Sequence, residues 1–528
     1  MLVPKVITAS EAVALIENNK TLCTVGMTLV AVPEFLLKEI EKQFLETGNP
    51  SNLTLVHSCG QSDRVRGIAH LAHEGLLKRI IGGHWGLCPP LMKLIDDNHV
   101  EAYNLPQGQM ANMYHSMALR EPGKISKVGL GTFIDPRIEG GKMNERTKKL
   151  EDIVKVIEID GEEYLQYMPI PIDYLIMRGT YCDENGNFST VNEAMNLEVL
   201  PAVMATKRYG GKVICQVERI VKNGTINPKE VIVPGVFIDY VVKCENPFED
   251  HRQTSAWYYD PSYSGQAVAA TSDDDGIPLN VRKIIGRRAM MFLEPYSIVN
   301  VGTGIPNDTV GPIIIEEDIS DYIMITVESG VYGGKPAGGV DFGISQNPQA
   351  LLSHDRQFEY YNGKGIDFTF MGAGEIDSKC NINATKMGPS ATGAGGFIDI
   401  TATAQNVIFC STFTSGGLEV SISPKEGLRI IKEGKYDKFV SEVQQISYNF
   451  EEISKTGQKA FFVTERAVFE LTTDGPVLIE IAKGIDLEKD IINKMGFKPI
   501  IADDLQITSL KLYEEEPFGL RKLIESKL

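Results

Sequence analysis

Two segments of this chain repeat each other at a fixed offset. "IDYLIMRGTYCDENGNFS" begins at Ile172 and "IDFTFMGAGEIDSKCNIN" begins at Ile366, and they share Ile, Asp, Met, Asp and Asn at positions 194 residues apart. At the same offset, "VI" at 213–214 recurs as "VI" at 407–408. Each copy is typical of a strand, an acidic turn and a second strand. Chance similarity between β-rich segments is the alternative, but the constant offset favours duplication, which predicts two halves of related structure.

The length of the chain also favours two domains. A chain of 528 residues exceeds what one hydrophobic core usually supports. Residues 245–280 are polar, rich in aspartate and contain "SDDDG", which suits a surface connection. We therefore expect an N-terminal domain over 1–244, a linker over 245–280 and a C-terminal domain over 281–528.

Both halves begin with a pattern that alternates helices and strands. Thr8 and Glu11 have the spacing of a capping box, "TLCTV" from Thr21 predicts a strand, and Pro33 to Leu45 has the apolar spacing of a helix. "NLTLVHSCG" and "KVGLGTFIDPR" predict further strands that end in loops. "VRKIIGRRAMMFLEPYSIVNVGTGIPND" then gives helix, strand and glycine turn again. The predicted class is α/β, with two related open domains of mostly parallel sheets.

Composition excludes several classes of protein. The formal net charge of −18 argues against a nucleic-acid partner, because phosphate neutralisation needs an excess of Lys and Arg. Eight scattered cysteines show no metal-like spacing and are typical of buried thiols in a reducing cytoplasm. We expect no export signal and no membrane span.

A lone carboxylate lies in a glycine-rich stretch. "TVESGVYGGKPAGGVDFG" has five glycines between Glu328 and Gly339, and the strand-like "DYIMITV" precedes it. Glu328 is therefore expected at the carboxyl end of a strand, where open α/β sheets bind ligands. The alternative is a glutamate that only caps or salt-bridges the turn. The glycines favour a functional role, because they let the backbone approach a ligand closely.

A second glycine cluster, "MGPSATGAGGFIDI" over 387–400, is expected to end in a strand and so not to be a dinucleotide-binding fingerprint. Gly333-Gly334-Lys335 is no P-loop, because Pro336 stands where Ser or Thr is needed. Backbone N–H groups in such turns can face a developing oxyanion, and tight turns alone are the alternative. His84 in "GHWG" is expected to be structural rather than catalytic, and His57, His70 and His73 show no metal-ligand pattern.

These motifs together resemble the family I CoA-transferases, in particular the single-chain acetate and propionate CoA-transferases. The resemblance includes "VESGVYGGKPAGG", "QFEYYNGKGIDFTFMGAGEID", "GAGGFIDI" and "FCSTFTSGGLEV". It extends to "AHEGLLKRIIGGHW", "AYNLPQGQ", "GTFIDPRIEGGKMNE", "QVERIVK", "VTERAVFEL" and "IAKGIDLEKDI". It thus covers nearly the whole chain.

The resemblance implies site residues and a mechanism. Glu328 matches the catalytic glutamate, which forms a glutamyl-CoA thioester in a ping-pong exchange of CoA between a short-chain acyl-CoA and a free carboxylate. Gln107, Gly395 and Gly396 are implied as the groups that stabilise the oxyanion, with the site at the interface between the halves. The implied CoA neighbours are Gly302, Gly304, Gly333 and Gly334. Coenzyme A is a substrate, no metal or ATP is needed, and the protein is expected to be a cytoplasmic homo-oligomer, such as a tetramer.

One turn departs from the family pattern. In "VGMTLVAVPE" the side chains of Met27, Leu29 and Val30 replace a usually small, glycine-rich sequence, which puts the preferred acid in doubt. Two other functions remain open: an acyl-CoA hydrolase on the same fold, and a CoA- or nucleotide-binding regulator without turnover. The regulator would have no need of Glu328.

Overall fold

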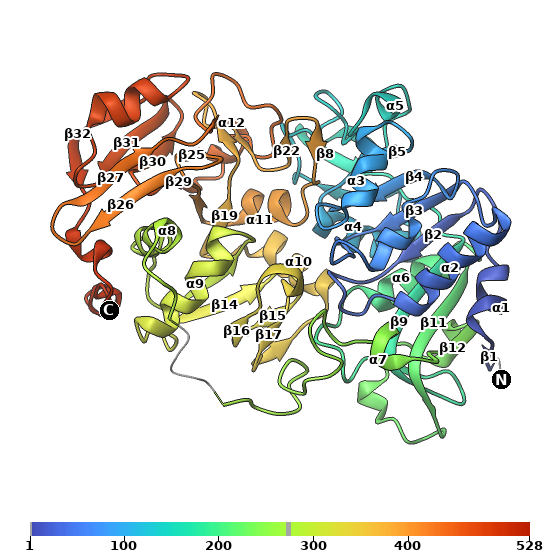
Figure 1. Ribbon diagram of the computed structural model, residues 1–528. Helices are drawn as coiled ribbons and strands as arrows, with labels where there is room; N and C mark the ends of the chain where they lie inside the picture. Colours follow the sequence, from blue (N-terminus) through green and yellow to red (C-terminus); the bar gives the residue numbers. More distant parts are fainter. Residues whose placement is uncertain (1–2, 271–275) are drawn as a thin grey trace. The chain divides into compact units, whose positions relative to one another are not determined.

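The computed structural model describes residues 3–270 and 276–528. The chain divides into two compact units (Figure 1). Unit 1 comprises residues 1–269, 328–360 and 388–399, and unit 2 comprises residues 270–327, 361–387 and 400–528. Unit 1 thus includes two segments from the second half of the sequence. The domain boundaries expected from the sequence stay a prediction, and residues 271–275 of the expected linker lie outside the described residues.

A parallel sheet forms the centre of unit 1. Its order is β1 (Lys5–Val6), β12 (Tyr240–Lys243), β11 (Lys212–Val221), β9 (Tyr174–Asp183), β2 (Thr21–Thr24), β3 (Leu53–His57), β4 (Leu77–Gly82) and β5 (Glu101–Asn104). All these neighbours pair in parallel, and β10 (Phe188–Ser189) pairs antiparallel with β9. A small antiparallel sheet is formed by β6 (Lys124–Ser126), β8 (Glu162–Tyr167) and β7 (Val154–Ile159). The mostly parallel sheet expected from the sequence is confirmed.

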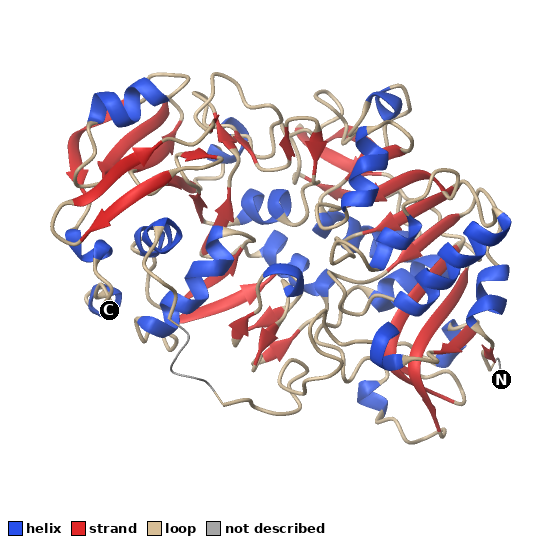
Figure 2. Cartoon of the chain, in the orientation of Figure 1, coloured by secondary structure: helices blue, strands red, loops and turns tan. Residues whose placement is uncertain are grey.

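Helices cover this sheet (Figures 1 and 2). They are α1 (Ala9–Ala14), α2 (Glu34–Thr47), α3 (Pro89–Asp96), α4 (Gln107–Ala118), α5 (Glu145–Lys148), α6 (Val199–Arg208) and α7 (Pro247–Asp250). The capping box of α1 is present, because Thr8 Oγ1 accepts from the Glu11 N–H and Glu11 Oε2 accepts from the Thr8 N–H. Helix α1 packs on α2, and α6 packs on α4, β9 and β11.

The central strands of unit 2 follow the order β14 (Ile323–Val327), β13 (Ser297–Val301), β19 (Phe368–Gly372), β24 (Asn406–Cys410), β29 (Lys459–Val463), β30 (Ala467–Thr472), β31 (Gly475–Ile481) and β32 (Ile500–Ile507). The strands from β14 to β29 are parallel, and β30 is antiparallel to both of its neighbours. Within unit 2, α8 (Val281–Met290) and α9 (Ile305–Glu316) pack on this sheet, and α12 (Phe450–Ser454) and α13 (Leu520–Glu525) follow. A core that includes Val299, Phe368 and Ile408 joins these layers.

The structure confirms the repeat. Strands β9 and β19 begin 194 residues apart, and so do β11 and β24. In unit 1, Asp183 Oδ1 accepts from the N–H groups of Asn185 and Asn187, at 2.9 Å each. In unit 2, Asp377 Oδ1 accepts from the N–H groups of Lys379 and Asn381, at 2.9 and 3.0 Å. The acidic turn predicted in each copy is therefore the same turn.

One predicted strand is absent. "KVGLGTFIDPR", expected to give a strand before a loop, forms successive turns over residues 127–137. Asp135 accounts for the difference, because its carboxylate accepts from the N–H groups of Gly131 and Arg137, at 3.1 and 3.0 Å. Local side-chain bonds of this kind compete with strand pairing. In the part of the chain that the structure describes, no helix is long and apolar enough to span a membrane.

Candidate active site

Glu328 follows β14 directly and belongs to unit 1. Its side chain is buried, with an exposed fraction of 8%. The turn that carries it is held at both following residues: the Ser329 hydroxyl donates to the Gly343 carbonyl, and the Gly330 carbonyl accepts from the Leu352 N–H at 2.8 Å. Gly330 has φ of 105°, and a Cβ there would lie 2.2 Å from the Leu352 carbonyl oxygen. The sequence therefore needs glycine at 330 to place the carboxylate, as expected for a strand-end glutamate.

The Glu328 turn is followed by a short strand, and the strand that pairs with it is followed by a buried histidine. The two-residue strands β15 (Val331–Tyr332) and β18 (Ala350–Leu351) are antiparallel. His354, the first residue of α10 (His354–Gly363), comes soon after β18 and is fully buried. Its Nδ1 lies 2.8 Å from Glu198 Oε2, and its Nε2 lies 2.9 Å from the Gln107 side-chain nitrogen.

Gln107 is the first residue of α4 and contacts the second glycine cluster. Its backbone N–H donates to the Gly395 carbonyl at 2.9 Å, and the Gly395 N–H donates to the Gly83 carbonyl at 2.8 Å. Gly395 therefore shapes the loop here with φ of 53°, and its N–H is already engaged. Within the described ranges, the Gly396 N–H has no backbone acceptor, which makes Gly396 the better candidate for an oxyanion donor. Unit 1 thus brings together Gln107 and Gly395 from the two sequence halves.

The segment after this loop corrects a prediction. Residues 397–400 were expected as a strand and instead begin α11 (Phe397–Thr403). Asp399, fully buried, accepts from the Gly108 N–H at 2.8 Å and from the Gln109 side chain at 2.7 Å. A carboxylate is favoured at the N-terminus of α4, where helix N–H groups lack partners. These tertiary bonds outweigh the strand preference of "FIDI" and fix Gln107 against the Gly395 loop.

The four glycines expected near CoA lie in different places. Gly302 and Gly304 are in unit 2, after β13 and at the start of α9, where Gly304 has φ of 84°. Gly333 and Gly334, with φ of 67° and 72°, form the turn between β15 and β16 (Lys335–Pro336) in unit 1. Their role toward CoA stays a prediction.

The residues that depart from the family turn are buried in unit 1. Met27, Leu29 and Val30 have exposed fractions of 5% or less. Met27 and Met195 lie next to Gly343, where a Cβ would come within 3.1 Å of the methyl carbon of each side chain. Because the Gly343 carbonyl accepts from Ser329, these methionines are close neighbours of the Glu328 turn.

One side-chain group has the composition of a metal site. Cys59, Glu198 and His354 bring potential ligand atoms together, all buried. However, both ring nitrogens of His354 already make contacts, to Glu198 at 2.8 Å and to Gln107 at 2.9 Å. Ligands of a tetrahedral zinc ion, each about 2.0–2.3 Å from the metal, lie farther apart than this. The group fits a hydrogen-bonded relay better than a cation.

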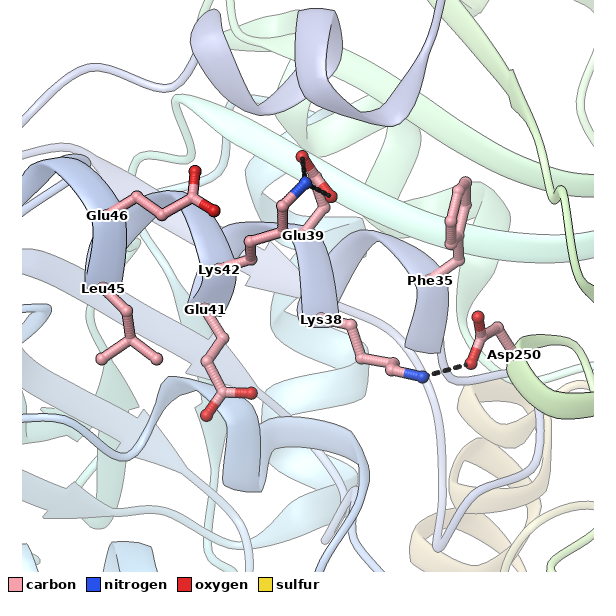
Figure 3. A pocket seen from close by; sticks show the side chains of 8 residues that line it. All are labelled: Phe35, Lys38, Glu39, Glu41, Lys42, Leu45, Glu46 and Asp250. Atoms are coloured by element: carbon pink, nitrogen blue, oxygen red, sulfur yellow. Dashed lines mark hydrogen bonds and ion pairs between the residues drawn. The ribbon is translucent and has the colours of Figure 1, made fainter.

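In unit 1, His57 is buried and His84 is half-buried. Desolvation lowers the pKa of each imidazole to about 4, aided at His84 by the charge interaction with His57, so both are neutral at physiological pH. A surface groove along α2 holds none of the predicted site residues (Figure 3). Its lining is charged, with Lys38 paired to Asp250 at 2.7 Å.

The sequence reasoning missed Glu198, His354 and Asp399. His354 is 247 residues from Gln107 and lies in no recognisable motif, so only the pairing of β15 with β18 reveals it. Asp399 could have been predicted as a site residue, because it closely follows the glycine cluster "GAGG".

Comparison with known proteins agrees with this architecture. A family model for coenzyme A transferase matches residues 6–244. Acetate CoA-transferase YdiF of Escherichia coli (strain K12) is 38% identical over 519 residues, which cover 97% of this chain and 96% of that protein. The chain belongs to the coenzyme A transferase family. Caffeate CoA-transferase of Acetobacterium woodii is 40% identical over 522 residues, covering 98% of each chain.

Solved structures show the same fold over the full length. The apoenzyme of the acyl-CoA transferase YdiF from Escherichia coli O157:H7 matches with a TM-score of 0.91 and 36% identity, covering 98% of this chain and 97% of that one. A thioester complex of that protein with CoA matches with a TM-score of 0.90. The expected α/β class is therefore confirmed as the CoA-transferase fold, and the chain is a transferase.

Proposed function

We propose that this enzyme transfers CoA between a short-chain acyl-CoA and a free short-chain carboxylate, through a glutamyl-CoA thioester on Glu328. The observation that carries the proposal is the buried carboxylate of Glu328 at the carboxyl end of β14, in the unit that also holds Gln107 and Gly396. A carboxylate nucleophile splits one difficult exchange into easier acyl transfers.

The chemistry needs only the carboxylate and the two substrates. A Glu328 oxygen attacks the thioester carbonyl carbon, and the C–S bond breaks to give a mixed anhydride and CoA thiolate. The thiolate then attacks the Glu328 carbonyl carbon and expels the donor acid as a carboxylate, which leaves glutamyl-CoA. The acceptor carboxylate attacks this thioester and expels the thiolate, and the thiolate attacks the new acyl carbonyl and returns Glu328 as a carboxylate.

Each attack passes through a tetrahedral oxyanion. We assign the Gln107 side chain and the Gly396 N–H to its stabilisation, because the backbone bond from Gln107 to Gly395 holds the start of α4 against the loop that carries Gly396. Removal of one such donor commonly costs about a hundredfold or more in rate. Burial of Glu328 supports the exclusion of water, which would hydrolyse the anhydride.

We propose acetate and propionate as the preferred acids, and Met27 and Met195 beside the Glu328 turn support a small acyl pocket. The reaction conserves the thioester, so we propose that neither ATP nor a metal takes part. Eight buried cysteines, none of them in a disulfide, support a cytoplasmic location. We also propose a homo-oligomer, which light scattering of the purified protein measures.

Initial-rate kinetics tests the mechanism. Double-reciprocal plots against acyl-CoA and acceptor acid should be parallel, and labelled acid should exchange into its own acyl-CoA without a second acid. Intersecting lines together with no exchange contradict the covalent route. Thiol release that proceeds equally fast without any carboxylate would instead identify a hydrolase. Transfer rates measured with acetate, propionate and caffeate as acceptor acids show which acyl groups the enzyme accepts.

A further inference from the structure

The mechanism above does not use the buried ionisable pair of Glu198 and His354 in unit 1. Glu198 precedes α6, His354 begins α10, and both side chains have exposed fractions of 0%. Burying a charged pair is costly unless its hydrogen bonds are satisfied. Here both oxygens of Glu198 have a donor: Oε1 accepts from the Ser58 hydroxyl, and Oε2 lies 2.8 Å from His354 Nδ1.

The other ring nitrogen of His354 faces Gln107. Because Nδ1–H donates a hydrogen bond to Glu198, the protonation state of Nε2 decides whether that nitrogen accepts or donates a hydrogen bond. A neutral imidazole has a lone pair at Nε2 and accepts from the Gln107 side-chain N–H. An imidazolium has an N–H at Nε2 and donates, so it requires the Gln107 side-chain oxygen on its side.

These two states present opposite ends of the Gln107 amide to the glycine loop. With the amide nitrogen toward His354, Gln107 Oε1 lies on the Gly395 side, 3.7 Å from where a Cβ on Gly395 would be. That oxygen cannot donate to an oxyanion. Rotation of the amide by half a turn, which pairs Oε1 with a protonated His354, places the amide N–H groups there instead.

We propose that Glu198 and His354 are positioning residues, which hold the side-chain amide of Gln107 with its N–H groups toward the reacting carbonyl when His354 is protonated. The relay runs from the start of α6 through α10 to the start of α4, entirely within unit 1. It deepens the proposed function and rests on it, because it needs an oxyanion that Gln107 stabilises.

The surroundings of His354 support the protonated state. Burial opposes the imidazolium, but its contacts with Cys59 and Glu198 outweigh this and hold the pKa of His354 well above its usual value. Burial raises the pKa of the Cys59 thiol, whose sulfur lies 3.5 Å from Nε2. Tyr114 on α4 is also neutral, because burial raises its pKa, and Phe358 packs edge-on at 5.0 Å.

The pH profile of kcat tests the relay. Deprotonation of His354 should turn the amide and lower kcat, which gives a basic limb. Glu198→Gln keeps the shape of the side chain but removes its charge, so the limb should move to lower pH by about one unit or more. Above the new limb, kcat should fall on the order of tenfold, a size common for an orienting partner. KM should change little.

Glu193→Gln is the matched control. Glu193 is a buried carboxylate nearby in sequence, paired with Arg178 at 2.6 Å and outside the relay. The Glu193→Gln variant should have a lower melting temperature and an unchanged basic limb in its pH profile of kcat. Cys59→Ala removes one of the two contacts that raise the pKa of His354, so the limb should move to lower pH but persist. A limb that disappears in this variant assigns it to the thiol and overturns the proposal.

A double-mutant cycle covers the case in which Glu198→Gln folds poorly. Gln107→Ala removes the amide, so its low kcat should show no limb, and Glu198→Gln should add no further loss of kcat per folded molecule. Additive losses, or an unmoved limb in Glu198→Gln, overturn the relay. A failure of the covalent mechanism is distinguishable from a failure of the relay, because in that case the wild-type enzyme itself forms no thioester at Glu328.

Discussion

Glu328 is expected to be sensitive to the length of its side chain. Glu328→Asp withdraws the carboxylate by one methylene, and a misplacement of about 1 Å can cost roughly a hundredfold in rate. We predict a kcat about a hundredfold lower with a nearly unchanged melting temperature, measured by initial rates and thermal unfolding.

Glu465 provides the control at the same scale. It is buried in unit 2, where it pairs with Arg466 at 2.7 Å and accepts from the Phe413 N–H at 2.9 Å. Glu465→Asp should lower the melting temperature and keep most of kcat per folded molecule. A large loss of kcat in Glu465→Asp, together with a largely retained kcat in Glu328→Asp, would show that Glu328 is not the nucleophile.

A half-buried histidine in unit 1 gives a pH-dependent stability. Burial opposes a charged His70, but bonds to Glu34 and Glu41, at 2.8 and 2.5 Å, outweigh it and raise the pKa of His70. Because the folded pKa lies above the unfolded one, this stabilisation is complete below about pH 6.5 and is lost as the pH rises through the folded value. His70→Gln should therefore shift the urea midpoint of unfolding more at pH 6 than at pH 9.

The comparison for His70 is His99, which is 40% exposed beside the mostly exposed Glu74. His99→Gln should shift the midpoint little at either pH. An equal shift for His70→Gln at both pH values contradicts the account of its charge.

At the scale of elements, the repeat could be predicted because its key bonds are local. Asp183 and Asp377 each bond to N–H groups two and four residues ahead, so a short stretch of sequence contains the whole turn. The start of α11 could not be predicted in this way. Its Asp399 bonds to Gly108, 291 residues distant, and that partner is visible only in the fold.

The contact of α4 with α10 and α11 predicts a strict need for glycine at 108. A Cβ there would lie 2.3 Å from the Phe358 ring and 2.7 Å from Asp399 Oδ1. Overpacking of this kind commonly costs about 1–3 kcal/mol. Gly108→Ala should lower both the melting temperature and kcat, because the neighbouring Gln107 moves with it.

Gly363→Ala is its control, since a Cβ at this end of α10 meets nothing within 4 Å. It should leave both quantities nearly unchanged. Wild-type values for Gly108→Ala would show that α4 is not held as tightly as the contacts indicate.

For the whole molecule, sequence order and compact units do not coincide. The sequence predicted that Gln107 and Glu328 work together, but not that 328–360 and 388–399 belong to unit 1. The linear sequence does not show which segments of the second half return to unit 1 and pack there. Residues 281–528 expressed alone should therefore lack their unit 1 partners and have no measurable CoA transfer, whereas co-expression with 1–280 should restore it. Near-native transfer by 281–528 alone would contradict the site.

The central claim is a covalent bond between CoA and Glu328, and peptide mass spectrometry after trapping tests it most directly. Acyl-CoA supplied without an acceptor acid should accumulate glutamyl-CoA, because the second half-reaction lacks its carboxylate. Borohydride reduces a thioester and spares a free carboxylate, so it should inactivate the enzyme and convert Glu328 to an alcohol, and hydroxylamine should leave a hydroxamate there. The account predicts modification at Glu328 alone. Modification at Glu375 or Glu465 instead, or at no residue in a fully active enzyme, would contradict it.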